Sequence, residues 1–372
     1  MGGGASPIST IPTVNKGGLI IRFGHMLGTH PSRGDNYFDT VLAVAQASEA
    51  AGLDAIFYPD HFQFQWHGRL VRGARMMATA LHRWGHFHAL AQTLEVWAGS
   101  IARRADTDPR RTLAVLECFT TLAAVAAATQ HIRLGALVAG VPYRNPALLA
   151  KINVTLDVIS HGRCIVGLGA GWHEEEFEAY GWPFPSIQQR LDGLEDAVRI
   201  IDTMMTQRRA SYTGTYHRIM DALSHPLPIQ QPRPPILIGG NGERRTLRLV
   251  AQYADYCNIF GDPATVARKL EVLRRHCAAV GRPYESIVRS NFVSILIAPN
   301  ESELARKRQQ YTTRPGHPIV GTPDRVIAAL QAYVDAGIQY VVFSLPDAHT
   351  LEPIQLLAET VIPAFTDPNI AA

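Results

Sequence analysis

Two short stretches of the sequence bring together residue types that can do chemistry. Asp60 and His61 directly follow the apolar run 55–59, and a histidine beside a carboxylate can transfer protons near neutral pH. A purely structural hydrogen-bonded pair is the alternative. Further along, Gly239, Gly240, Asn241 and Gly242 end another apolar run before a helix expected near Glu243. Backbone N–H groups at such a place can hold a phosphate, with Arg244 or Arg245 adding charge, although a plain left-handed turn remains possible.

A third stretch, GLGAGWHEEEFEAYGW at 167–182, combines glycines, acids and aromatic residues. Its pattern is G-x-G-x-G rather than the G-x-G-x-x-G of dinucleotide-binding folds, so it does not predict that function. The glycines allow the backbone to approach a flat or bulky ligand closely. The three acids at 174–176 suit the first turn of a helix, where they complement its dipole. A metal site would need further His or Asp residues to converge on these acids, and only His173 is adjacent to them. Tyr180 can donate a hydrogen bond to a ligand oxygen.

The stretch 63–112 forms the longest connection in the chain and is predicted to be functional. Apolar residues within 74–105 recur at near-helical spacing, which predicts an inserted amphipathic helix or helix pair acting as a lid or a subunit contact. Three histidines there (His82, His86 and His88) make a zinc site one interpretation of this stretch. They lack the adjacent carboxylate of an H-E-x-x-H site, so solvated or packing histidines are the simpler interpretation.

Composition restricts the class of protein. With 372 residues, 47% of them hydrophobic and 18% charged, the chain is expected to fold around a sizeable core. A net charge of +3 does not indicate nucleic-acid or membrane binding. Four scattered cysteines predict buried thiols in a reducing compartment, and no secretory or membrane-spanning segment is seen, so we expect a cytoplasmic protein. Residues 1–18 are expected to be a flexible leader.

The elements that must position these residues alternate along the chain. Short apolar runs consistent with buried strands are separated by helical patterns, which predicts parallel strands with crossover helices. The eight runs lie at 19–23, 55–59, 132–140, 163–171, 234–240, 255–261, 289–299 and 339–346. Eight such units favour a closed (β/α)₈ TIM barrel over an open doubly wound sheet, in one domain spanning 19–365. In a barrel, chemistry lies in the loops that follow the strands, and Asn145 with Pro146 is predicted to begin a helix after the third one.

Several segments together resemble the bacterial luciferase-like superfamily, and more narrowly its deazaflavin (coenzyme F-420)-dependent oxidoreductases. They are YPDHF at 58–62, ATQHIRLGALVAGVPYRNPALLAK at 128–151, TLDVISHGRCIVGLGAGWHEEEFEAYG at 155–181, PPILIGGNGERRTLRLVAQYAD at 234–255 and GTPDRVIAAL at 321–330. The resemblance runs from about residue 19 to the last helix and departs most at 63–112.

The resemblance implies where a cofactor ring would lie. Members hold it at the C-terminal mouth of the barrel, against a backbone bulge after the third strand that often contains a non-proline cis peptide. It places Asp60 and His61 beside the reactive edge of the ring, with His61 as acid/base and Asp60 orienting it. The cofactor-binding residues that it implies, together with Tyr180 from the argument above, are Leu137, Val138, Ala139, Gly169, Ala170, Gly171, Trp172, Gly239, Gly240, Asn241 and Gly242.

The function expected from these features is hydride transfer between reduced coenzyme F-420 and a small organic substrate. A monooxygenase that uses reduced FMN and O₂ is the alternative, because both cofactors carry a ribityl phosphate. A non-catalytic flavin-binding subunit is a further possibility, against which the Asp60–His61 pair argues. No metal is expected, and superfamily members are commonly homodimers, for which Trp84 and Trp97 would suit the interface.

Overall fold

The computed structural model describes residues 21–28, 37–65, 77–78, 81, 88, 90–94, 96–97, 112–311 and 317–366. Contacts between Cα atoms divide the chain into two compact units. The first comprises Met1–Gly28, Phe38–Asp60 and Glu117–Ala372, and the second comprises Thr29–Tyr37 and His61–Leu116.

The first unit is built on a closed barrel of eight parallel strands. The strands are β1 (Arg22–Met26), β2 (Ala55–Tyr58), β5 (Arg133–Ala136), β7 (Cys164–Gly169), β10 (Ile236–Gly239), β11 (Tyr256–Ile259), β12 (Val288–Ile297) and β14 (Tyr340–Ser344). Each pairs in parallel with the next, and pairing of β10 with β7 and of β14 with β1 closes the ring. The predicted TIM barrel is therefore confirmed, and the open sheet is excluded.

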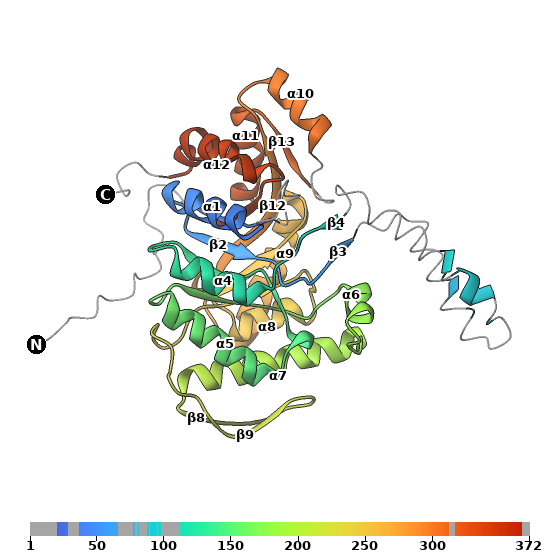
Figure 1. Ribbon diagram of the computed structural model, residues 1–372. Helices are drawn as coiled ribbons and strands as arrows, with labels where there is room; N and C mark the ends of the chain where they lie inside the picture. Colours follow the sequence, from blue (N-terminus) through green and yellow to red (C-terminus); the bar gives the residue numbers. More distant parts are fainter. Residues whose placement is uncertain are drawn as a thin grey trace, which may run out of the picture. The chain divides into compact units, whose positions relative to one another are not determined.

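Helices cover the outside of the barrel, as Figure 1 shows for the neighbouring α4, α5, α7 and α8. Their bounds are α1 (Tyr37–Ala50), α4 (Cys118–Ala127), α5 (Pro146–Ile159), α6 (Glu174–Ala179), α7 (Ile187–Thr206), α8 (Thr246–Tyr253), α9 (Pro263–Val280), α10 (Glu301–Gln310), α11 (Pro323–Asp335) and α12 (Glu352–Leu356). Local chemistry sets several helix starts. Asn145 accepts from the N–H groups of Ala147 and Leu148 with Pro146 as the first helical residue, as predicted.

Alternate residues of the strands point into the barrel and pack together. This interior cluster includes Phe57, Ile165, Leu237, Tyr340 and Val342, with Val138 and Phe292 packed against it. Strands β2, β7 and β14 are buried along their whole length, which explains their continuous apolar sequences. The interior is thus filled with side chains, and ligands can reach only its ends.

Some elements differ from the sequence prediction. The strand predicted over 132–140 is interrupted. Strand β5 ends at Ala136, and a short strand β6 (Ala139–Gly140) follows the interruption. Helix α7 begins at Ile187, because Ser186 and Gln189 form a reciprocal capping box ahead of the pattern predicted from 190. An antiparallel hairpin of β8 (Arg209–Thr213) and β9 (Arg218–Leu223), seen beside α7 in Figure 1, was missed.

The second unit contains a small antiparallel ladder. Strand β3 (Phe64–Gln65) pairs with β4 (Thr112–Leu113), so that Gln65 lies opposite Thr112. Between them, the described residues 77–78, 81, 88, 90–94 and 96–97 are helical, as the apolar spacing within 74–105 predicts. The rest of this stretch lies outside the described residues. The ladder brings the two ends of the stretch 66–111 together.

All four cysteines are free and buried, as expected. Burial raises the pKa of the Cys118 thiol and of the Cys164 thiol well above the ordinary range, which makes both unreactive. Among the described helices, none is both long and apolar enough to cross a membrane.

Candidate cofactor site at the barrel mouth

The break after β5 places an apolar side chain at the barrel mouth. The Leu137–Val138 peptide bond is cis, at the position that the resemblance implied. The Val138 side chain lies against two strand-end glycines. A Cβ atom on Gly169 would come within 2.5 Å of Val138 Cγ2, and one on Gly239 within 2.9 Å of Cγ1. Val138 therefore occupies the space that side chains of β7 and β10 would otherwise fill.

Asp60 fixes the loop that carries this valine. Its carboxylate is buried and accepts hydrogen bonds from the Gly140 N–H at 2.9 Å and from both terminal nitrogens of Arg144 at 2.7 and 2.9 Å. Arg144 also pairs with Glu117 at 2.7 Å. Burial raises the pKa of the Asp60 carboxyl, while Arg144 and the Gly140 N–H act in the opposite direction. Asp60 thus joins the end of β2 to the loop that follows β5.

The glycine-rich loop lies beside the same valine. Gly240 has a φ of +136°, which favours glycine, and its N–H donates to Asn258 O. The Asn241 amide binds both backbone groups of Phe260, at 3.0 and 2.5 Å. Helix α8 begins at Thr246 rather than near Glu243 as predicted, because residues 243–245 form a turn. Within the described chain, no group accepts a hydrogen bond from the N–H groups of 241–245.

The cations around this loop differ from those expected. Arg245 pairs with Asp192 and with Glu195, and Arg244 is exposed. Lys269 instead reaches the loop: its Nζ donates to Asn241 O at 2.9 Å and pairs with Glu243 at 2.8 Å. Hydrogen bonds from Lys269 and Arg268 lower the pKa of the Glu243 carboxyl. The cation that bonds to the backbone of this loop is therefore Lys269 of α9.

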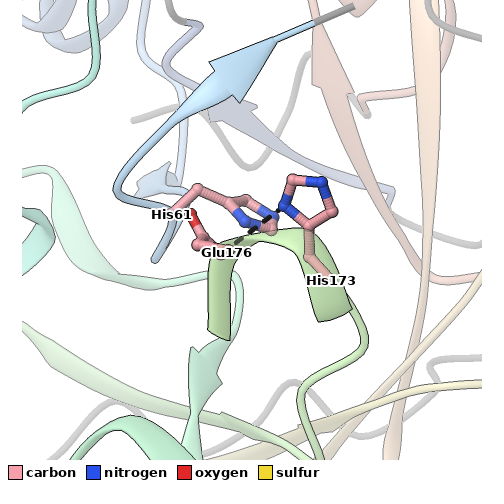
Figure 2. Close-up of side chains that lie close together, drawn as sticks. All are labelled: His61, His173 and Glu176. Atoms are coloured by element: carbon pink, nitrogen blue, oxygen red, sulfur yellow. Dashed lines mark ion pairs between the residues drawn. The ribbon is translucent and has the colours of Figure 1, made fainter. Parts of the chain in front are cut away.

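The loop after β7 carries a buried acid that the sequence did not distinguish from its neighbours. Glu176 is fully buried, whereas Glu174 is exposed. Tyr143 Oη donates to Glu176 Oε2 at 2.7 Å, and His173 Nδ1 lies 3.7 Å from the same oxygen (Figure 2). Burial and the Glu176 carboxylate raise the pKa of Tyr143. Glu176, and to a smaller extent Glu175, raise the pKa of His173, against the opposing effect of burial.

Aromatic side chains surround this acid. The Tyr143 ring lies 4.8 Å from that of Phe177 and 5.1 Å from that of Trp182. Gly140 permits this arrangement, since a Cβ atom there would come within 2.4 Å of the Tyr143 ring. Trp172 is 65% exposed, and Tyr180 is 47% exposed with its ring stacked on Trp182. Of the two aromatic residues predicted to contact the cofactor, Tyr180 thus joins this group through Trp182, and the Trp172 ring lies 4.9 Å from that of His173.

The remaining predicted residues are placed as follows. Leu137, Ala170 and Gly171 lie in the loops after β5 and β7, Ala139 begins β6, and Gly242 is exposed in the loop after β10. His61 follows Asp60 in the chain and is the first residue of the second unit. Its predicted acid/base role stays a prediction. Of the three histidines considered for zinc, His82 and His86 lie outside the described residues, as does Trp84.

Comparison with known proteins identifies the class of protein. Residues 18–318 match the model of the luciferase-like monooxygenase family, so the chain belongs to this family of oxidoreductases. It is 25% identical over 351 residues to the F420-dependent glucose-6-phosphate dehydrogenase of Kineococcus radiotolerans, covering 86% of this chain and 90% of the relative. It is 29% identical over 191 residues to the FMNH₂-dependent dimethylsulfone monooxygenase of Pseudomonas putida, covering 51% of each.

A solved structure agrees at the level of the fold. An F420-dependent secondary alcohol dehydrogenase in complex with an F420-acetone adduct superposes with a TM-score of 0.71 at 17% identity, covering 94% of this chain and all of the other. Members of the family thus use F420 or reduced FMN.

The geometry of the barrel mouth fits either cofactor. Gly169 and Gly239 have no side chain, so together with Val138 they offer an apolar surface that can support a flat ring. The N–H groups of 241–245 with Lys269 offer donors for a phosphate. Sequence reasoning missed Arg144, Glu117 and Lys269 as the groups that fix these loops. No sequence pattern identifies these three residues, because each lies far along the chain from the residue that it contacts.

Proposed function

We propose that the chain binds a reduced deazaflavin, coenzyme F-420, and exchanges a hydride between it and a small organic substrate. The supporting observation is that the Val138 support and the 241–245 donors meet at one end of one barrel, since Val138 contacts Gly239, where the donor loop begins. The F420-dependent relative also aligns over most of both chains, whereas the FMN-dependent relative aligns over half.

We propose a different task for the cofactor and for each of the residues around it. The deazaflavin, when bound, supplies the ring carbon that gives or takes hydride. Val138 supports the ring, and the loop 241–245 holds the phosphate. Asp60 keeps the Val138 loop in place through Gly140 and Arg144. His61 is proposed to exchange the proton that accompanies hydride transfer.

The same comparison supports a substrate class to test first. The relatives named above include a glucose-6-phosphate dehydrogenase and a secondary alcohol dehydrogenase. We therefore propose interconversion of a C–OH group and a carbonyl as the reaction to screen first. The second unit, which contains the stretch that departs most from the family pattern, is proposed to carry contacts specific to the substrate.

Titration of the purified chain with F420 and with FMN tests the cofactor, by quenching of cofactor fluorescence. We expect saturable binding of F420 and weaker binding of FMN. Gly239→Val should abolish binding of both, because its side chain would enter the space of Val138. Gly193→Ala is the matched control, since a Cβ atom there meets nothing closer than 3.6 Å. Tight FMN binding without F420 binding would contradict the deazaflavin assignment.

Reduced-FMN-dependent oxygenation is the second candidate function. The 29% identity to the dimethylsulfone monooxygenase supports it. Oxygen consumption with reduced FMN, coupled to loss of an added organic substrate, would favour this candidate. A deazaflavin carries carbon at ring position 5 and does not form the peroxide that oxygenation needs, so F420 dependence and oxygenation are separable outcomes.

A further inference from the structure

The loop after β7 contains a carboxylate–imidazole pair that the proposed function does not use. His173 ends this loop, four residues after Gly169, which contacts Val138. Glu176 lies one helical turn further on, so both side chains project from the same end of α6 (Figure 2). The pair therefore belongs to the barrel unit and lies at its C-terminal end.

Glu176 is unusual because it is a fully buried carboxylate in a short surface helix. Burying a carboxylate costs free energy unless hydrogen bonds or opposite charge compensate it. Tyr143 supplies a hydrogen bond at 2.7 Å, and Tyr143 is itself held between Gly140 and the rings of Phe177 and Trp182. The carboxylate is thus fixed from the loop after β5 and faces the imidazole of His173.

The imidazole lies between two acids of different exposure. Nδ1 faces the buried Glu176 at 3.7 Å, and Nε2 lies 3.5 Å from Glu175 on the more exposed side. The side chain of His173 is 14% exposed, so solvent can exchange its proton. A buried carboxylate at one ring nitrogen, with the other nitrogen beside the partly exposed Glu175, resembles the arrangement that orients a general acid–base histidine. Both separations exceed hydrogen-bond length, and such contacts often tighten only when a ligand binds.

We infer that His173 is a proton-transfer residue of the barrel mouth, with Nε2 as the exchanging atom and Glu176 as its positioning carboxylate. This inference rests on the proposed function. In the reducing direction, hydride from the reduced deazaflavin adds to the substrate carbonyl carbon and the carbonyl π electrons move to oxygen. The Nε2 proton of His173 passes to that oxygen, leaving a neutral imidazole that solvent reprotonates. This inference gives His173 the substrate proton that the proposed function gives to His61, and variants at each position distinguish the two assignments.

The first experiment follows the His173 imidazole by NMR in the full-length chain, with the signal assigned from the His173→Gln variant. Within the barrel unit, its ion-pair partners are Glu175 and Glu176, and Tyr143 acts through Glu176. Glu176→Gln should lower the His173 pKa by about one unit, a roughly tenfold change in its protonation equilibrium. Glu175→Gln, at the more exposed partner, should lower it less. An unchanged His173 pKa in Glu176→Gln would overturn the pairing.

The second experiment counts protons taken up when the cofactor binds, by calorimetry with F420 and FMN in two buffers of different ionisation enthalpy. Wild type should take up protons and bind more weakly as the pH rises through the His173 pKa, by roughly tenfold across the transition. His173→Gln should still bind but lose both effects, which a merely structural histidine would not cause. Proton uptake as large in His173→Gln as in wild type would overturn the inference alone. Absence of binding of either cofactor to wild type would overturn the proposed function and the inference with it.

If Glu176→Gln fails to fold, Tyr143→Phe provides the same test with a smaller change. Removing the hydroxyl leaves Glu176 one hydrogen bond short and should alter the His173 pKa in the NMR titration. His173 makes no side-chain cap to α6, so His173→Gln should leave this helix intact, which circular dichroism can check. An unaltered His173 pKa in Tyr143→Phe would then count against the pairing.

Discussion

At the scale of single residues, Asp60 shows how one side chain can support a site from a distance in the sequence. The sequence predicts Asp60 beside His61, as an orienting carboxylate. In the structure its oxygens accept from Arg144 and Gly140, which lie more than seventy residues further along the chain. No local pattern identifies this partnership, because the closure of the barrel creates it.

Asp60→Asn should destabilise the fold by about 1–3 kcal/mol, because it removes the buried charged acceptor of Arg144 and of the Gly140 N–H, while Arg144 keeps its pair with Glu117. Chemical denaturation followed by circular dichroism measures this change in the free energy of unfolding. Glu303→Gln is the control, since it breaks the exposed pair with Arg306 and should cost less than about 1 kcal/mol. Equal effects of the two substitutions would argue against a structural role for Asp60.

His61→Asn should reduce turnover by about 10²–10⁴-fold, the usual contribution of general acid–base catalysis. Cofactor affinity should remain nearly unchanged, because the proposed ring support and phosphate donors are Val138 and 241–245. Steady-state kinetics on the substrate found by the C–OH screen, beside a fluorescence titration of the cofactor, measure both quantities. Unchanged turnover would remove His61 from the mechanism.

At the scale of elements, alternation and apolar runs were sufficient to predict all eight barrel strands and the helices between most of them. The apolar pattern alone did not predict the break after β5, because a cis peptide leaves no compositional signal, whereas the family resemblance implied a bulge at this place. The β8–β9 hairpin was missed because its residues are largely exposed and its apolar pattern is weak. Glu176 could not be separated from Glu174 and Glu175, since burial in a short helix depends on what packs against it.

The contact between Val138 and the strand-end glycines gives a prediction about packing. Gly169→Ala should destabilise the barrel by about 1–3 kcal/mol, because its Cβ atom would overlap the valine. Val138→Ala combined with Gly169→Ala should recover part of this loss, giving a coupling free energy in a double-mutant cycle. Purely additive effects, measured by denaturation, would show that the two residues do not share this space.

Asp196 of α7 gives a prediction about pH at the hairpin. Burial raises the pKa of its carboxyl, but hydrogen bonds from the N–H groups of Tyr216 and His217 and from Tyr212 Oη outweigh this and lower it below the ordinary value of 3.8. The Asp196 carboxyl therefore binds a proton more readily in the unfolded chain than in the folded chain. Its contribution to stability is complete above a pH of about 4 and is lost as pH falls through the lower pKa of the folded state.

Asp196→Asn should therefore reduce stability at neutral pH by about 1–3 kcal/mol and flatten the acid limb of the stability–pH curve. Unfolding free energies measured from neutral pH down through the carboxyl range test this. The exposed Asp335→Asn serves as the control and should leave the acid limb intact. An acid limb in Asp196→Asn as steep as that of wild type would contradict the assignment.

At the scale of the whole molecule, the family and the barrel follow from sequence, while the division into two units depends on contacts that only a structure gives. Removing residues 70–105 should leave cofactor affinity within a few-fold of wild type and abolish turnover, if the second unit contributes to the substrate site as proposed. Fluorescence titration and kinetics on the truncated chain measure this. Loss of soluble folding would indicate instead that the stretch stabilises the chain or a subunit contact.

The pairing of Gln65 with Thr112 has a consequence for how such an enzyme can change over time. A stretch whose two ends are already neighbours can be replaced as a unit, because its length can vary without altering the path of the flanking chain. If this stretch carries substrate contacts as proposed, new substrate preferences can arise by replacing it while the barrel is inherited unchanged. Grafting the corresponding stretch of a relative between these two positions would be the natural way to reprogram specificity in the laboratory.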